Sequence, residues 1–176
     1  MDVFAHILWV AALFKALNQK YKLKYNLAWA GFWGVFPDLF AFIPLFAWRF
    51  YHRLVLGETI PFRGPIEPSA TNALPIHSLT HGLYSLSHSA IIFFIVFVMV
   101  WKVWKYYGKP MPWVIGGWLA HILLDIPTHS YRFYPTPFLW PISEWKFNGI
   151  SWATPWFMLV NYTALVAVCI ILWKKK

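Results

Sequence analysis

The sequence predicts an all-α fold, a polytopic membrane helix bundle with about five membrane helices and two long outer loops in a single integral-membrane domain, residues 1–176. Three observations predict this class. First, 60% of the residues are hydrophobic and only 12% are charged, whereas soluble domains carry about 25% charged residues. Second, the apolar residues gather in long runs that a soluble chain of this length could not bury. Third, Trp and Tyr crowd the ends of those runs, as in an interfacial belt.

The apolar runs define the predicted elements, because a helix needs about 20 apolar residues to cross a bilayer. The first and fourth runs are short for a full span, and Pro37 interrupts the second. A helical extension of the third run reaches back to His77. The long connections 51–75 and 129–152 contain several prolines and are typical of functional loops. The five runs are Val3–Leu17, Tyr25–Phe50, Ser87–Tyr107, Pro112–Thr128 and Ala153–Trp173.

Basic residues orient the predicted array. Lysines surround the first and third connections and end the chain, and five spans place all three positions on one side. The positive-inside tendency puts that side in the cytoplasm. The sequence therefore predicts a multi-pass protein of the cytoplasmic membrane, with its N-terminus outside and its C-terminus in the cytoplasm. The net charge of +9 reflects these anchors, and since no basic stripe or binding motif is present we expect no nucleic-acid partner.

The histidines and two membrane-embedded aspartates fall toward the opposite, outer side. The sharpest element is the pair His121 and Asp125 in the fourth run, because residues four apart lie on one face of a helix. Asp38 follows a predicted kink at Pro37, which is a usual setting for a polar site at membrane depth. Ionisable groups inside a membrane span are costly, so they are functional candidates. Imidazole and carboxylate groups are also ligands of Zn²⁺.

Other histidines supply further candidates at the same depth. His6 lies near the outer start of the first run, and His88 opens the third. His81 precedes His88 by seven residues, a step that keeps both on one helical stripe. His129 lies four residues beyond Asp125. Each residue alone also fits a plainer role, such as a hydrogen-bonded helix pair, a helix cap or a solvent-facing imidazole, but these roles do not explain why so many share one side.

These motifs, in this order, resemble the membrane-bound metal-dependent hydrolase family, also described as LexA-binding, inner-membrane-bound hydrolases. Members are small multi-span proteins with an N-terminal His and the motifs Pro-Asp, Thr-His-Ser, Ser-His-x-x-x-Asp and Leu-Trp-Pro. The resemblance covers nearly the whole chain, and the combination of short motifs carries it. The matching residues are His6, Pro37-Asp38, Ser87-His88-Ser89, Ala120-His121-Ile-Leu-Leu-Asp125 and Leu139-Trp140-Pro141.

The chain departs from the family pattern at two places. The family often has a second carboxylate two residues after Pro-Asp, where this chain has Phe40. It also often has His-Arg-Gly just before Thr-His-Ser, where this chain has Leu83-Tyr84-Ser85, and His81 is a candidate substitute two positions earlier. The run Asp125-Ile-Pro-Thr-His129 is in addition similar to the Asp-x-x-x-His runs of zinc-dependent phospholipase C, an analogy that favours a phosphoester substrate.

The residues and the resemblance together predict a membrane-embedded metal-dependent hydrolase that acts on a lipid or lipid-linked phosphoester. One or two divalent ions, with zinc expected first, would activate a water molecule in the outer half of the membrane. The expected metal ligands are His6, Asp38, His88, His121 and Asp125. The expected catalytic residues are Asp38, Asp125, His81 and His129, and the candidates for holding a substrate phosphate are Arg53, Arg63 and Arg132.

Other classes of protein use the same residues. A non-catalytic metal-binding or transport protein would hold the ions without chemistry, and a membrane haem protein would use axial His pairs on facing helices. A polar cluster that only joins helices is the plainest alternative. Beyond the lipid bilayer and a lipid substrate, the sequence identifies no partner, and regulation by a soluble protein is suggested only by the name of the family.

Overall fold

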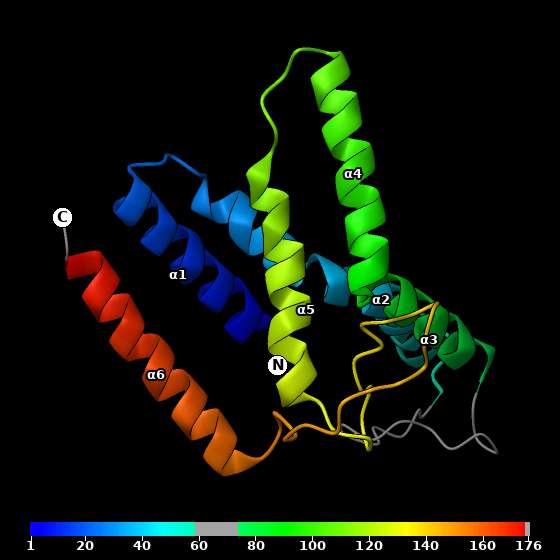
Figure 1. Cartoon of the computed structure of the whole chain (residues 1–176). Helices are drawn as coiled ribbons and strands as arrows, with labels where there is room; N and C mark the ends of the chain where they lie inside the picture. The colour runs from blue at the N-terminus through cyan, green and yellow to red at the C-terminus, as the bar shows by residue number, and fades with distance from the viewer. Residues whose placement is uncertain (59–73, 175–176) are drawn as a thin grey trace.

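The computed structural model describes residues 1–58 and 74–174, and every regular element in these ranges is helical (Figure 1). The all-α class expected from the sequence is therefore confirmed. The helices in chain order are α1 (Val3–Tyr21), α2 (Leu27–Leu54), α3 (Pro75–Ser87), α4 (Ala90–Tyr106), the short 3₁₀ helix η2 (Trp113–Ile115), α5 (Gly116–Thr128) and α6 (Pro155–Lys174).

The first two helices extend beyond their predicted ends. α1 continues to Tyr21, because its polar last turn still forms helical hydrogen bonds, and Lys22 ends it in the left-handed region with a φ of 53°. α2 contains both Pro37 and Pro44, so the predicted interruption at Pro37 does not end the helix. A proline removes one backbone donor, and neighbouring helices can satisfy the carbonyl groups left around it.

The third predicted segment is not one straight helix. α3 and α4 form a broken pair that bends by 60° around His88. Ser89 starts α4 as its N-cap, since its hydroxyl oxygen accepts a hydrogen bond of 3.2 Å from the backbone N–H of Ile92. The predicted helical extension back to His77 is thus confirmed, but the helix axis changes direction at His88. The helical stripe that His81 and His88 share therefore ends with α3.

Two helices, α2 and α6, are each long and apolar enough to cross a membrane, and the bent pair α3 and α4 passes the same test when taken together. η2 and α5 form a shorter apolar stretch, and α1 carries Lys15 and Lys20 toward its end. By length and composition the described residues thus contain two or three candidate spans. That all five predicted segments cross the bilayer stays a prediction.

Glycines bring α1, α2 and α5 into close contact, as small residues commonly do between membrane helices. A Cβ atom on Gly34 would lie 2.7 Å from Cβ of Val10 in α1, and a Cβ atom on Gly117 would lie 2.7 Å from the carbonyl oxygen of Ala30 in α2. α6 lies along α1 (Figure 1), where the indole of Trp9 donates a hydrogen bond of 2.8 Å to Asn161. α1, α2 and α5 therefore pack against one another, and Gly117 also approaches Val10 of α1.

The connection from His129 to Thr154 is non-helical, which confirms the second predicted long loop. It returns to the end of α5, because Gly149 donates to the carbonyl of His129 at 2.8 Å and Ile150 donates to that of Pro127 at 2.9 Å. At its middle it contacts the start of α4, where the N–H of Ala90 lies 3.0 Å from the carbonyl of Phe138. This segment, residues 129–154 and hereafter the outer loop after the side that the sequence predicts for it, is therefore attached to both α4 and α5.

Candidate metal centre

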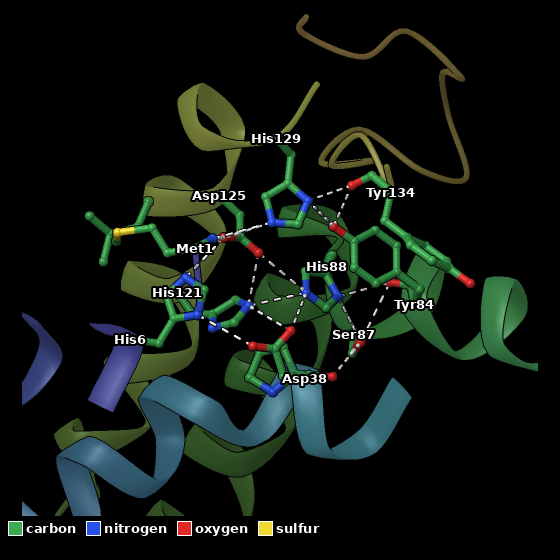
Figure 2. Close-up of polar contacts among 12 residues, drawn as sticks. Met1, His6, Asp38, Tyr84, Ser87, His88, His121, Asp125, His129 and Tyr134 are labelled. Carbon is green, nitrogen blue, oxygen red and sulfur yellow. Dashed lines mark hydrogen bonds and ion pairs between the residues drawn. The ribbon is translucent and has the colours of Figure 1, made fainter. Parts of the chain in front are cut away.

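Five buried polar side chains converge between the helices, and they are the five predicted metal ligands (Figure 2). α1 and α2 each supply one, the break between α3 and α4 supplies another, and α5 supplies two. The spacing of four residues places both α5 side chains on the same face, as expected. The converging residues are His6, Asp38, His88, His121 and Asp125.

Four ligand atoms lie within 4.8 Å of one another: Nε2 of His88 and His121, and one carboxylate oxygen each of Asp38 and Asp125. Nε2 of His121 lies 3.1 Å from Nε2 of His88 and 3.1 Å from Oδ2 of Asp125. Nε2 of His88 lies 3.6 Å from Oδ1 of Asp38 and 3.5 Å from Oδ2 of Asp125. A tetrahedral Zn²⁺ with bonds of about 2.0–2.1 Å separates its ligand atoms by roughly 3.4 Å. These residues therefore fit a single divalent ion.

The second nitrogen of each of these two histidines faces a backbone carbonyl. Nδ1 of His121 lies 2.7 Å from the carbonyl oxygen of Gly34, and Nδ1 of His88 lies 3.2 Å from that of Tyr84. A carbonyl oxygen only accepts hydrogen bonds, so these contacts favour the tautomer with the proton on Nδ1, which turns the lone pair of Nε2 toward the centre. This is the arrangement by which proteins orient metal-binding histidines.

The centre gathers acceptors rather than matched donors and acceptors. Oδ2 of Asp125 is buried and has no hydrogen-bond partner among the described residues, while the two Nε2 lone pairs point at the same place. A buried charged acceptor without a partner is costly. A bound cation would satisfy all four atoms at once.

His6 contacts the carboxylate oxygens that face away from the four-atom set. Its Nε2 lies 2.9 Å from Oδ1 of Asp125, and its Nδ1 lies 3.3 Å from Oδ2 of Asp38. The close approach of α1 at Gly34 brings the ring there, so His6 bridges the two carboxylates. It thus joins the centre as predicted, but it lies beside the four-atom set rather than within it.

His129 also contacts the centre, at Oδ1 of Asp125, which lies 3.4 Å from its Nε2. Its Nδ1 lies 2.7 Å from the carbonyl oxygen of Tyr134, so Nε2 again presents a lone pair. Tyr134 holds this carbonyl with a φ of 43°, a left-handed conformation that is costly for a bulky residue. The hydroxyl of Tyr84 donates to the same carbonyl at 2.8 Å, and this contact helps to hold the strained turn.

Sequence reasoning missed three contacts of this centre. The nitrogen of Met1 is hydrogen-bonded to Asp125 and lies 3.2 Å from Nε2 of His129. Tyr84 and Tyr134 orient His129, and the one available signal was that Tyr84 stands where the related pattern has Arg. Every residue has a backbone carbonyl, so the sequence does not indicate that the carbonyl of Tyr134 orients His129.

Other predicted residues lie away from the four-atom set. The ring of His81 stacks on Tyr134 with centroids 4.8 Å apart, so it approaches the centre through that tyrosine. Arg53 and Arg132 are exposed, and within the described ranges no hydrogen bond or ion pair ties either to the centre. Arg63 lies outside the described residues. Their proposed roles stay predictions.

An aromatic layer covers the side of the centre that faces the opposite end of the bundle. The indole of Trp118 donates a hydrogen bond of 2.5 Å to the carbonyl of Ser87, the residue before His88. Its ring packs edge-on against Phe36 and Phe93, with centroids 5.2 and 5.5 Å away. An apolar shell of this kind excludes water and strengthens electrostatic interactions inside the site.

Comparisons with known proteins agree with a membrane location. The model of a family described as YdjM inner membrane protein matches residues 1–176, the whole chain. No curated protein and no solved structure matches the chain. The match supports the inner-membrane part of the resemblance drawn from the motifs.

Proposed function

The chain belongs to the YdjM inner membrane protein family, and we propose that it is a membrane-embedded metal-dependent hydrolase that acts on a lipid or lipid-linked phosphoester. One observation carries the proposal. Two imidazole nitrogens with fixed lone pairs and two carboxylate oxygens converge in a buried space that fits one divalent ion. Three separate parts of the chain contribute these atoms, which is more than a single helix-to-helix contact requires.

The proposed orientation places this centre in the outer half of the inner membrane, with the N-terminus outside and the C-terminus in the cytoplasm. The ends of α1 and α6 support it, because they lie together and both carry lysines. The side chain of Gln19 donates to the carbonyl of Leu172 at 2.7 Å, and Lys15 lies over the ring of Trp173. The outer loop follows the opposite end of α5, where the centre lies (Figure 1).

A bound divalent ion would supply Lewis acidity and lower the pKa of a coordinated water toward about 7. Asp38, Asp125, His88 and His121 would hold the ion. Nε2 of His129 lies 3.4 Å from Oδ1 of Asp125 and 3.2 Å from the nitrogen of Met1, and it would accept a proton from water. His6 would keep both carboxylates in place through its two ring nitrogens.

The number of ligands narrows the choice of ion. Structural zinc sites are closed by four protein ligands, whereas catalytic sites keep a position open for water. The four-atom set would fill a tetrahedral ion, so hydrolysis requires coordination by at least five atoms. Zinc in an expanded coordination, or an ion such as Mn²⁺ that accepts more ligands, meets this requirement. Haem fits less well, since the two Nε2 atoms, 3.1 Å apart, leave no room for a porphyrin between them.

The first experiment is metal analysis of the purified protein beside the variant Asp125→Asn. We expect a stoichiometric divalent ion in the parent protein and its loss in the variant, because the amide cannot replace the carboxylate ligand. Asp2→Asn is the control, since Asp2 is a partly buried, hydrogen-bonded aspartate that caps α1 outside the centre. No metal in the parent protein, even after reconstitution with zinc or manganese, would contradict the proposal.

Function is then tested by hydrolysis of phospholipids and lipid phosphates in the loaded and chelated states. Release of product by the loaded protein, lost after chelation and in His121→Ala, is the expected result. Retained size-exclusion behaviour of the variant excludes unfolding as the cause of the loss. Sustained metal flux into proteoliposomes, with no hydrolysis of any lipid phosphoester, would instead identify a transporter.

A further inference from the structure

We propose that a pocket between α3 and the outer loop recognises the zwitterionic amino-alcohol phosphate head group of a membrane lipid. This inference names the substrate class of the proposed hydrolase and rests on that function. The pocket has a volume of about 460 Å³, within the roughly 300–1,000 Å³ of small-molecule sites. α3 contributes one lining residue and the outer loop contributes the rest: Ser85, Tyr131, Pro137, Trp140, Glu144, Trp145 and Lys146.

The lining combines aromatic faces with one charge of each sign. Tyr131, Trp140 and Trp145 offer the ring faces that attract an ammonium group, and the carboxylate of Glu144 adds a negative charge. Lys146 offers a positive charge to a phosphate. Among the described residues no ion pair joins Glu144 to Lys146, so neither neutralises the other. Two separate opposite charges complement a zwitterion better than an anionic head group.

Contacts within the outer loop hold this lining in place. The hydroxyl of Tyr131 donates to the carbonyl of Lys146 at 3.0 Å, and its N–H donates to the side chain of Asn148 at 3.0 Å. The ring of Trp145 packs edge-on against Phe138 with centroids 5.5 Å apart. Since these rings are already positioned, a ligand need not order the loop in order to bind.

The same segments that line the pocket carry residues of the metal centre. Ser85 precedes His88 by three residues, less than one turn of helix. Tyr131 follows His129 by two, and the hydroxyl of Ser89 is hydrogen-bonded to the carbonyl of Trp140. A head group held in the pocket would therefore bring its phosphoester toward the centre.

The loop also presents apolar side chains that favour a membrane source for the ligand. Ile142, Phe147 and Ile150 are exposed and flank the lining residues 144–146 along the chain. Apolar groups and Trp at a loop beside apolar helices are typical of the membrane interface. At that depth the available zwitterionic ligand is a lipid head group rather than a soluble ester.

The test is native mass spectrometry of the chelated, detergent-purified protein with equal amounts of phosphatidylethanolamine and phosphatidylglycerol, so that no turnover occurs. We expect about tenfold preferential retention of phosphatidylethanolamine. Trp145→Ala and Glu144→Gln should each reduce this preference to about one, because each removes part of the ammonium site. Trp156→Ala is the matched control, since Trp156 is 54% exposed and Trp145 is 57% exposed, and it should keep the preference.

Equal retention of the two lipids by the parent protein, or an unchanged preference in both pocket variants, would overturn the inference. Displacement of the bound lipid by an equal concentration of glycerophosphoethanolamine would overturn the membrane source. The proposed hydrolase can fail separately. Selective lipid retention without metal-dependent hydrolysis would refute the enzyme and leave the pocket, whereas hydrolysis with no head-group preference would do the reverse.

Discussion

α4 and α5 lie on either side of one short connection, and they differ in which side chains they bury. α4 is an almost continuous apolar helix, yet only Phe93 is buried among its residues. α5 carries a His, an Asp and a Thr and buries all three. Lipid solvates apolar side chains as well as another helix does, so hydrophobicity does not decide which helix lies inside. Polar groups and small residues decide which helix is buried. In this protein the buried helix is the one that carries the polar side chains of the candidate site.

The largest loss of stability is expected from a substitution that prevents α5 from packing against α2. In Gly117→Val the new Cβ would meet the carbonyl oxygen of Ala30 and the side chain of Trp33 at 2.7 and 3.0 Å. Neither neighbouring group can move away without disturbing the backbone. We therefore expect the free energy of unfolding to fall by about 3 kcal/mol or more, and folded protein not to be recovered from detergent. Size-exclusion chromatography and thermal unfolding measure this. Gly82→Ala is the control, since its Cβ would meet no atom within 4 Å, and a stability as low as that of Gly117→Val would contradict the argument.

The next test asks whether the end of α5 carries chemistry as well as ligands. His129→Ala should leave metal content unchanged, because His129 lies outside the four-atom set, but should lower turnover by about 100-fold or more through loss of the proton acceptor. Metal analysis and lipid hydrolysis on the same samples separate the two effects. His81→Ala should cost much less, since its ring reaches the centre only by stacking on Tyr134. Equal losses in both variants would remove His129 from the proposed mechanism.

A smaller effect tests the aromatic layer between α4 and α5. Trp118→Phe keeps an apolar ring but removes the N–H that bonds to the carbonyl of Ser87 at 2.5 Å. Leaving that buried carbonyl unsatisfied should cost about 1–3 kcal/mol, read as a lower unfolding temperature. Trp156→Phe, at an exposed position of α6, should leave the unfolding temperature unchanged. If the two variants unfold at the same temperature, the hydrogen bond does not hold the helix break.

The smallest effect is expected on a lipid-facing surface. Leu159 of α6 is 70% exposed, whereas Leu165 of the same helix is 2% exposed. Leu159→Ala should change stability by less than about 0.5 kcal/mol, while Leu165→Ala should cost about 2–5 kcal/mol by leaving a cavity. Unfolding in a denaturant series compares the pair. A larger loss in Leu159→Ala would show that α6 has a protein partner on that face.

Much of this arrangement was accessible from the sequence, for definable reasons. Apolar run length indicated the helices, and the four-residue step placed His121 beside Asp125. The bend at His88 was not predicted, because an apolar count cannot distinguish one helix from two joined at a serine cap. The stacking of His81 on Tyr134 joins α3 to a loop residue, which helical spacing cannot predict. The carbonyls of Gly34 and Tyr134 orient two rings through backbone groups, which every residue carries alike.

The order of synthesis gives the helix break a further meaning. His6 and Asp38 leave the ribosome long before Asp125. The helix break at His88 lies between Asp38 and Asp125 in the sequence. Until α5 packs against α2, the carboxylate of Asp38 therefore lacks its neighbour His121. The bend keeps His88 turned toward the position that α5 will take. Assembly of the centre thus waits for α5, and an ion can be held by all four ligands only in a chain whose α5 is already in place.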